Sequence, residues 1–91
     1  MKTVLLYSLD GCPWCDELKD LLNSHSIEYV VRDIEKHDKE WENIKKETKN
    51  EFVPAVCILH HDKKMKEFIL PDIHFEDVEE CTEKVLKVLG Y

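Results

Sequence analysis

The chain has 91 residues, of which 43% are hydrophobic and 36% charged, and this suits a single globular domain over residues 1–91. Thirteen basic residues stand against twenty acidic ones, and the formal net charge of −7 argues against nucleic acids and anionic membranes as partners. The apolar runs are too short to span a bilayer, and no signal-peptide cleavage site follows the first of them. We therefore expect a cytoplasmic protein and, because no oligomerisation signal stands out, a monomer.

The first half of the chain predicts a β-α-β unit. Thr3–Tyr7 is a run of β-branched and apolar residues, which indicates a buried central strand. Pro13 suits the first turn of a helix that we expect to continue to about Asn23. Ile27–Ile34 then predicts a second strand, parallel to the first because right-handed crossovers join such strands.

The second half predicts one more helix, a hairpin and a last helix. A helix from Asp38 to about Lys49 precedes a third strand at Ala55–Leu59. The polar turn His60–Lys64 leads into a charged edge strand, Met65–Leu70, and a final amphipathic helix covers Phe75–Leu89. The order β-α-β-α-β-β-α predicts an α/β fold in which three helices flank a four-stranded mixed sheet.

The motif that carries chemistry is Cys12-Pro13-Trp14-Cys15, between the first strand and the first helix. The free N–H groups and the dipole of a helix start stabilise a thiolate, and such sites lower a cysteine pKa to about 3.5–7.5 from about 8.5. Cys15 shares the apolar stripe of Leu18 and Leu22, whereas Cys12 lies at the open end of the helix. We therefore assign Cys12 as the attacking nucleophile and Cys15 as the resolving thiol of a dithiol cycle.

Two other interpretations of the pair stay open, a redox-silent structural pair and a metal or iron–sulfur site. Zinc needs four ligands, and the other candidates form no second close pair, so we expect no bound metal. Cys57 and Cys81 fall on predicted apolar faces and are expected to be buried small hydrophobic residues. Trp14 is expected to face solvent as a contact surface, Trp41 to pack between helix and sheet, and the tandem His60-His61 to form an exposed polar turn.

The pattern Tyr7-Ser8, then Cys12–Cys15, then Phe52-Val53-Pro54 before a strand resembles the dithiol glutaredoxins, and the likeness extends over nearly the whole chain. The resemblance implies the thioredoxin fold and a thiol–disulfide oxidoreductase with Cys12 and Cys15 as its catalytic pair. It also implies that no cofactor is bound and that glutathione is the co-substrate. The expected partners are disulfide-containing proteins and glutathione.

The resemblance also supplies the expected binding residues for substrate and glutathione, which are Pro13, Trp14, Val53, Pro54 and Asp72. It implies that Pro54 follows a cis peptide bond and lies against the cysteine pair. The backbone of Val53 is then free to pair with a bound thiol peptide.

The sequence departs from the family pattern at the positions that contact glutathione. Leu9 stands where these proteins usually carry a lysine, and Leu70-Pro71 stands where they carry a glycine pair. These changes remove a charge-assisted contact and a close backbone approach. Lys45, Lys46 and Lys49 on the second predicted helix have two interpretations: solvated surface charges, which is the favoured one, or substitutes for the missing lysine. An alternative function is that of an electron donor, for example to ribonucleotide reductase, that thioredoxin reductase returns to its reduced form.

Overall fold

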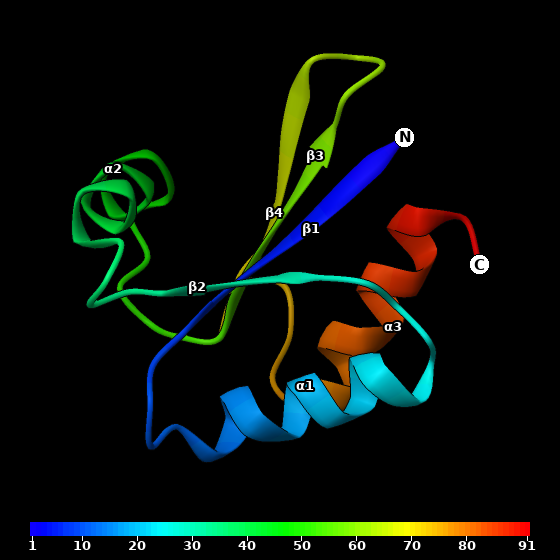
Figure 1. The fold of residues 1–91 in the computed structure, drawn as a ribbon, viewed down its shortest axis with the longest axis horizontal. Helices are drawn as coiled ribbons and strands as arrows, with labels where there is room; N and C mark the ends of the chain where they lie inside the picture. Colours follow the sequence, from blue (N-terminus) through cyan, green and yellow to red (C-terminus); the bar gives the residue numbers. More distant parts are fainter.

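The computed structural model describes residues 1–91 and has the predicted order of elements (Figure 1). Four strands form one sheet, and three helices flank it. The elements are β1 Lys2–Ser8, α1 Pro13–Ser24, β2 Val30–Asp33, α2 Asp38–Thr48, β3 Ala55–His60, β4 Met65–Ile69 and α3 Val78–Leu89. No helix is long and apolar enough to cross a membrane.

The sheet has the strand order β2-β1-β3-β4, with β1 in a central position as predicted. β1 pairs parallel with β2, where Leu5 lies opposite Val30, and antiparallel with β3, where Leu5 lies opposite Cys57. β3 and β4 form an antiparallel hairpin. α1 and α3 pack on one face of this mixed sheet, and α2 lies on the other (Figure 1).

The side chains on the two faces of β1 belong to two separate hydrophobic cores. Val4 and Leu6 belong to the larger core, together with Leu18 and Leu22 of α1 and residues of α3. The smaller core lies under α2 and contains Leu5, Tyr7, Trp41, Ile44, Ala55, Cys57 and Leu70. Because both faces of β1 are covered, its sequence is continuously apolar rather than alternating.

α2 is held on the sheet by a small set of contacts. Its buried residues are Trp41 and Ile44, and the Trp41 ring lies 5.5 Å from the ring of Tyr7, centre to centre. The Tyr7 hydroxyl donates a hydrogen bond of 2.5 Å to Glu40 on the same helix. Burial, and then the bonded Glu40 carboxylate, raise the pKa of Tyr7 far above its usual value, so the hydroxyl keeps its proton and remains a donor.

Two predicted elements are longer than the observed ones. The second strand begins at Val30 instead of Ile27, because Ser26 adopts a left-handed backbone and Ile27 enters the core from a loop. The last helix begins at Val78 instead of Phe75, because the Asp77 side chain accepts the N–H of Glu80 at 2.8 Å and caps the helix there.

The prediction of an exposed histidine pair is wrong for His60. This residue ends β3, is 5% exposed, and its Nε2 lies 3.1 Å from Glu67 of β4. His61 is exposed and lies 2.7 Å from the Thr3 hydroxyl. β3 continues one residue further than its apolar letters suggested, and the strand carries His60 into the sheet.

The two tryptophans provide a matched test of these packing differences. We expect Trp41→Ala to lower the free energy of unfolding by about 3–5 kcal/mol, because it empties the contact between α2 and the sheet. Trp14 is 41% exposed, and Trp14→Ala should cost less than about 1 kcal/mol. Urea denaturation of both variants measures the difference, and equal losses of stability would contradict this description of the core.

Candidate active site

The strand directions bring four chain segments to one edge of the sheet. β1 ends at Ser8, β2 ends beside it at Asp33, and β3 begins at Ala55 opposite Tyr7. β4 ends at Ile69, opposite Val56. The segments that follow β1, β2 and β4, and the one that precedes β3, therefore all emerge at the same edge.

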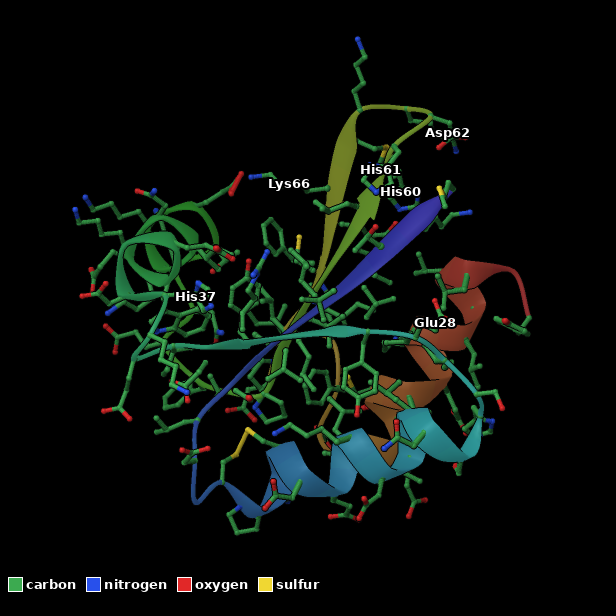
Figure 2. The ribbon with its side chains drawn as sticks, viewed as in Figure 1. Glu28, His37, His60, His61, Asp62 and Lys66 are labelled. Carbon is green, nitrogen blue, oxygen red and sulfur yellow. A yellow bond between two sulfur atoms is a disulfide. The ribbon has the colours of Figure 1, made fainter.

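The Cys12–Cys15 pair lies at this edge and is joined in a disulfide, with the two Cα atoms 5.2 Å apart (Figure 2). Cys12 is the N-cap of α1, and Pro13 occupies the first helical turn. The Cys15 N–H donates to the Cys12 sulfur at 3.1 Å, and the Asp16 N–H donates to the Cys12 carbonyl at 3.1 Å. A thiolate at Cys12 would therefore gain a backbone hydrogen bond and the positive end of the helix dipole.

The two sulfurs of the pair differ in burial. Cys15 is fully buried, as are Leu18 and Leu22 on the same helical stripe, whereas Cys12 is partly exposed. Pro13 and Trp14 between them face solvent. A substrate in solution can thus reach the Cys12 sulfur, whereas the buried Cys15 sulfur is accessible to Cys12. This difference fits the roles predicted for the two residues.

The segment Lys49–Pro54 leads from α2 into β3 and ends in a cis peptide bond between Val53 and Pro54, as the resemblance implies. Pro54 is buried and Val53 is partly buried. Asn50, which is 4% exposed, donates through Nδ2 to the Phe52 carbonyl at 2.9 Å and so fixes the backbone just before Val53. Asn50 is not among the predicted site residues. An asparagine after a helix end is nevertheless a common signal of a turn that the asparagine side chain stabilises by a hydrogen bond to the backbone.

The segment Leu70–Phe75 follows β4 and contains the predicted binding residue Asp72. Pro71 is buried, and Asp72 is exposed with a left-handed backbone, φ 63°. The Asp72 N–H donates to the Phe75 carbonyl at 2.9 Å. This segment occupies the place where the family pattern has its glycine pair.

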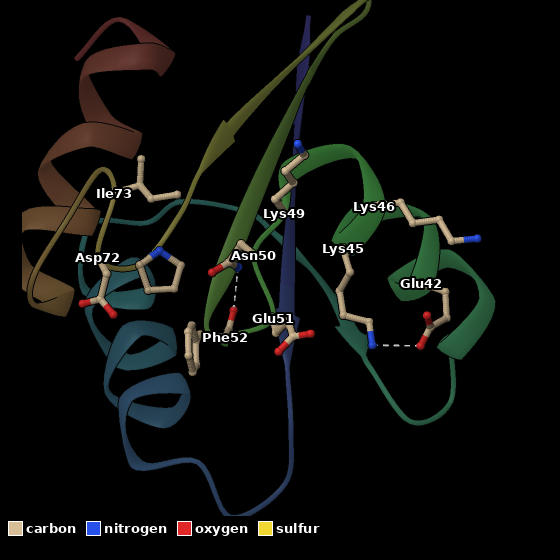
Figure 3. Close-up of a pocket in the computed structure, with 10 residues that line it drawn as sticks. Glu42, Lys45, Lys46, Lys49, Asn50, Glu51, Phe52, Asp72 and Ile73 are labelled. Carbon is tan, nitrogen blue, oxygen red and sulfur yellow. Dashed lines mark hydrogen bonds and ion pairs between the residues drawn. The ribbon is translucent and has the colours of Figure 1, made fainter.

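A groove of about 570 Å³ separates the end of α2 from these two segments (Figure 3). Lys45, Lys46 and Lys49 line it on the α2 side, and Phe52 and Ile73 are its exposed apolar residues, 63% and 62% exposed. Of the predicted binding residues, Asp72 lines this groove, whereas Pro13 and Trp14 lie on α1.

Lys45 is the groove lysine that has an acidic partner. Its Nζ lies 2.8 Å from Glu42, and this hydrogen bond raises the pKa of Lys45 and lowers the pKa of Glu42. Glu42 is exposed and Lys45 is partly exposed, so the pair contributes little to stability.

The remaining cysteines lie inside the molecule, as expected. Cys57 belongs to the core under α2 and Cys81 to the core under α1 and α3, so the sheet separates the two thiols. Burial raises the pKa of Cys57 to about 11 and that of Cys81 to about 12. No three histidine, cysteine or acidic side chains lie close enough together to hold a metal ion.

A cysteine pair that closes a disulfide at the start of the first helix, with a cis-proline just before β3 and a sheet of this order, defines a thiol–disulfide oxidoreductase of the thioredoxin fold. The chain matches the glutaredoxin family over residues 4–61 and belongs to that family.

Individual relatives agree with this assignment. The chain is 33% identical over 55 residues to an uncharacterized glutaredoxin-like 8.6 kDa protein in the rubredoxin operon of Clostridium pasteurianum, covering 60% of this chain and 73% of that protein. The fold of the present chain is similar to that of glutaredoxin 1 from Francisella tularensis, complexed with cacodylate. The TM-score is 0.61 and the identity 21%, over 100% of both chains. A glutaredoxin from Brucella melitensis has a TM-score of 0.54 and 16% identity, covering 97% of this chain and 80% of that one.

The difference in burial predicts an order of thiol reactivity. In the reduced protein at pH 7 we expect iodoacetamide to modify Cys12 about tenfold faster than Cys15. Cys57 and Cys81 should stay unmodified in the folded state, because their raised pKa values keep both thiols protonated at this pH. Mass spectrometry of timed, acid-quenched samples measures the rates, and faster modification of Cys15 would refute the assigned roles.

Proposed function

We propose that the chain reduces protein disulfides or glutathione mixed disulfides through a dithiol cycle, with glutathione as the co-substrate. The observation that carries the proposal is the pair itself, a partly exposed Cys12 at a helix start bonded to a fully buried Cys15. The cycle belongs in a reducing compartment, and we place the protein in the cytoplasm as a monomer.

The cycle begins with the reduced pair. The Cys12 thiolate attacks one sulfur of the substrate disulfide, a new S–S bond forms, and the other substrate sulfur leaves as a thiolate that takes up a proton. Cys15 then loses its proton and attacks the Cys12 sulfur, which releases the second substrate thiol. The product is the Cys12–Cys15 disulfide found in the structure. Two glutathione molecules return it to the dithiol and leave as glutathione disulfide.

The groove beside Phe52 supports glutathione as the reductant. Glutathione carries two carboxylates and one ammonium group, and the groove offers charges of both signs: its three lysines and the carboxylates of Glu42, Glu51 and Asp72. These lysines compensate for Leu9, the residue that stands at the family's lysine position. The Val53 backbone, directly before the cis bond to Pro54, is the segment for which the resemblance implies strand-like pairing.

A donor recycled by thioredoxin reductase is the second candidate, and a specific observation favours it. Leu70 and Pro71 replace the flexible glycines of the family, and Asp72 directly after them has a left-handed backbone. Such an electron donor would reduce protein disulfides, for example those of ribonucleotide reductase.

One assay distinguishes the glutathione-dependent function from recycling by thioredoxin reductase. It measures reduction of a glutathionylated peptide, with glutathione and glutathione reductase as the recycling system. Turnover supports the first, and turnover only with thioredoxin reductase supports the second.

The dithiol cycle predicts a trapped intermediate. Cys15→Ser should accumulate a mixed disulfide between Cys12 and glutathione or a substrate protein, because the resolving thiol is gone. Cys12→Ser is the matched control and should accumulate none, since its remaining Cys15 sulfur is buried. Non-reducing electrophoresis and intact mass measure the adducts, and equal trapping by both variants would contradict the cycle.

The lysines of the groove predict a salt-dependent loss of activity. Lys45→Gln/Lys49→Gln should lower kcat/KM for glutathione about three- to tenfold at low ionic strength. The control Lys36→Gln/Lys39→Gln makes the same change of net charge outside the groove and should have little effect. Salt screens exposed charges, so the difference should shrink at about 0.5 M salt. A loss that is equal in both double variants would exclude a specific role for the groove.

A further inference from the structure

The segment between β4 and α3 is closed by one histidine. The Leu70 N–H donates to Nδ1 of His74 at 3.0 Å, and the His74 N–H donates back to the Leu70 carbonyl at 2.9 Å. A third hydrogen bond, from the Asp72 N–H to the Phe75 carbonyl at 2.9 Å, lies across the same turn. The N–H of Leu70, the first residue after β4, thus has a side chain as its hydrogen-bond acceptor.

This contact fixes the protonation state of the ring. Nδ1 accepts a hydrogen bond, so the ring is neutral and carries its proton on Nε2. A protonated imidazolium donates from both nitrogens and cannot accept the Leu70 N–H. The hydrogen bond from the Leu70 N–H to the ring therefore requires neutral His74, whereas the two backbone hydrogen bonds of the turn do not.

The turn that His74 closes forms one wall of the groove. Pro71, Asp72 and Ile73 line the groove, and all three lie between the two residues joined by the contact. Asp72 adopts a left-handed backbone that a residue with a side chain populates rarely. The hydrogen bonds across the turn stabilise this backbone conformation of Asp72.

We propose that His74 is a positioning residue for the thiol substrate in the groove. Neutral His74 holds Pro71, Asp72 and Ile73 in the geometry that binds substrate. Protonation of the ring removes the acceptor for the Leu70 N–H, and the wall of the groove loosens. Substrate binding then weakens on acidification. The inference rests on the proposed function, because it takes the groove to be the substrate site.

Charged groups of both signs surround the ring. The hollow between β4 and α3 places it near Glu67, Lys84 and Lys87, and a second hollow places it near Asp72, Glu76 and Glu80. All of these groups remain in a variant that changes only position 74. A comparison of such variants therefore isolates the contribution of the ring.

The experiment compares His74→Asn and His74→Phe with the unchanged protein. Asparagine places its carbonyl oxygen where Nδ1 lies and accepts the same N–H without titrating, whereas phenylalanine has no acceptor. KM and kcat for a glutathionylated peptide are measured from about pH 8 to about pH 5.5, a range that spans ordinary histidine titration. His25→Asn, at the far end of α1, is the control for a histidine outside the groove.

We expect the ratio of wild-type KM to His74→Asn KM to rise about fivefold on acidification, the factor for about 1 kcal/mol and one hydrogen bond. Groups that titrate in both proteins cancel in this ratio. The KM of His74→Phe should be raised at every pH, and kcat should change little because the cysteine pair is untouched. A ratio that stays constant, or a His25→Asn profile that matches that of His74→Asn, would overturn the proposal.

A measurement without turnover keeps the two proposals apart. In ¹H–¹⁵N spectra the Leu70 amide of the unchanged protein should shift with the titration of His74 and stay constant in His74→Asn. A Leu70 amide shift in the unchanged protein that does not depend on pH would overturn the proposed hydrogen bond between Leu70 and His74. Lack of turnover by the unchanged protein would overturn the proposed function and the substrate-binding part of this inference. Turnover with a constant KM ratio would overturn this inference alone.

Discussion

The pairing of β1 with β3 is the constraint on which the site depends. Tyr7 lies opposite Ala55, so the chain after β1 and the chain before β3 leave the sheet at the same edge. One segment carries Cys12 and the other carries the cis-proline bond at Pro54. A slip of this register by one residue would turn every side chain of β3 to the opposite face and move the proline segment away from the cysteine pair.

α2 belongs to a different core from the helix that carries the cysteine pair. The large core under α1 and α3 supports the sheet and the cysteine pair, while α2 adds Trp41 and Ile44 to the smaller core. Its remaining surface is polar, and its last turn contributes lysines to the groove. Binding residues can therefore vary on α2 while the cysteine pair keeps its support.

Much of this arrangement was predictable from the sequence. The continuous apolar run at Thr3–Tyr7 identified the central strand, and Cys15 with Leu18 and Leu22 identified the buried side of α1. These signals are local, and the covalent spacing of the residues determines them. The Asp77 cap was also local, because an acidic N-cap followed three residues later by Glu80 predicts a helix start, but the apolar Phe75 masked it.

The features that were missed depend on contacts between distant residues or on loop conformation. His60 looked like part of a polar turn, and only its pairing across the hairpin with β4 shows that it is buried beside Glu67. Asn50 and His74 act through hydrogen bonds to backbone groups of their own loops, and periodicity carries no information about loop geometry. The groove itself is formed by two segments, one ending at Phe52 and the other beginning at Pro71, which composition and spacing cannot bring together.

The placement of Cys57 and Cys81 on opposite faces of the sheet has a consequence for the durability of the protein. A chain that repeatedly forms mixed disulfides risks exchange with any other thiolate within reach. Here a layer of backbone separates the two spare sulfurs from each other, and burial keeps both of them protonated at neutral pH. Internal disulfide exchange is thereby confined to Cys12 and Cys15, and the chain can pass through many oxidations and reductions without forming a wrong cross-link.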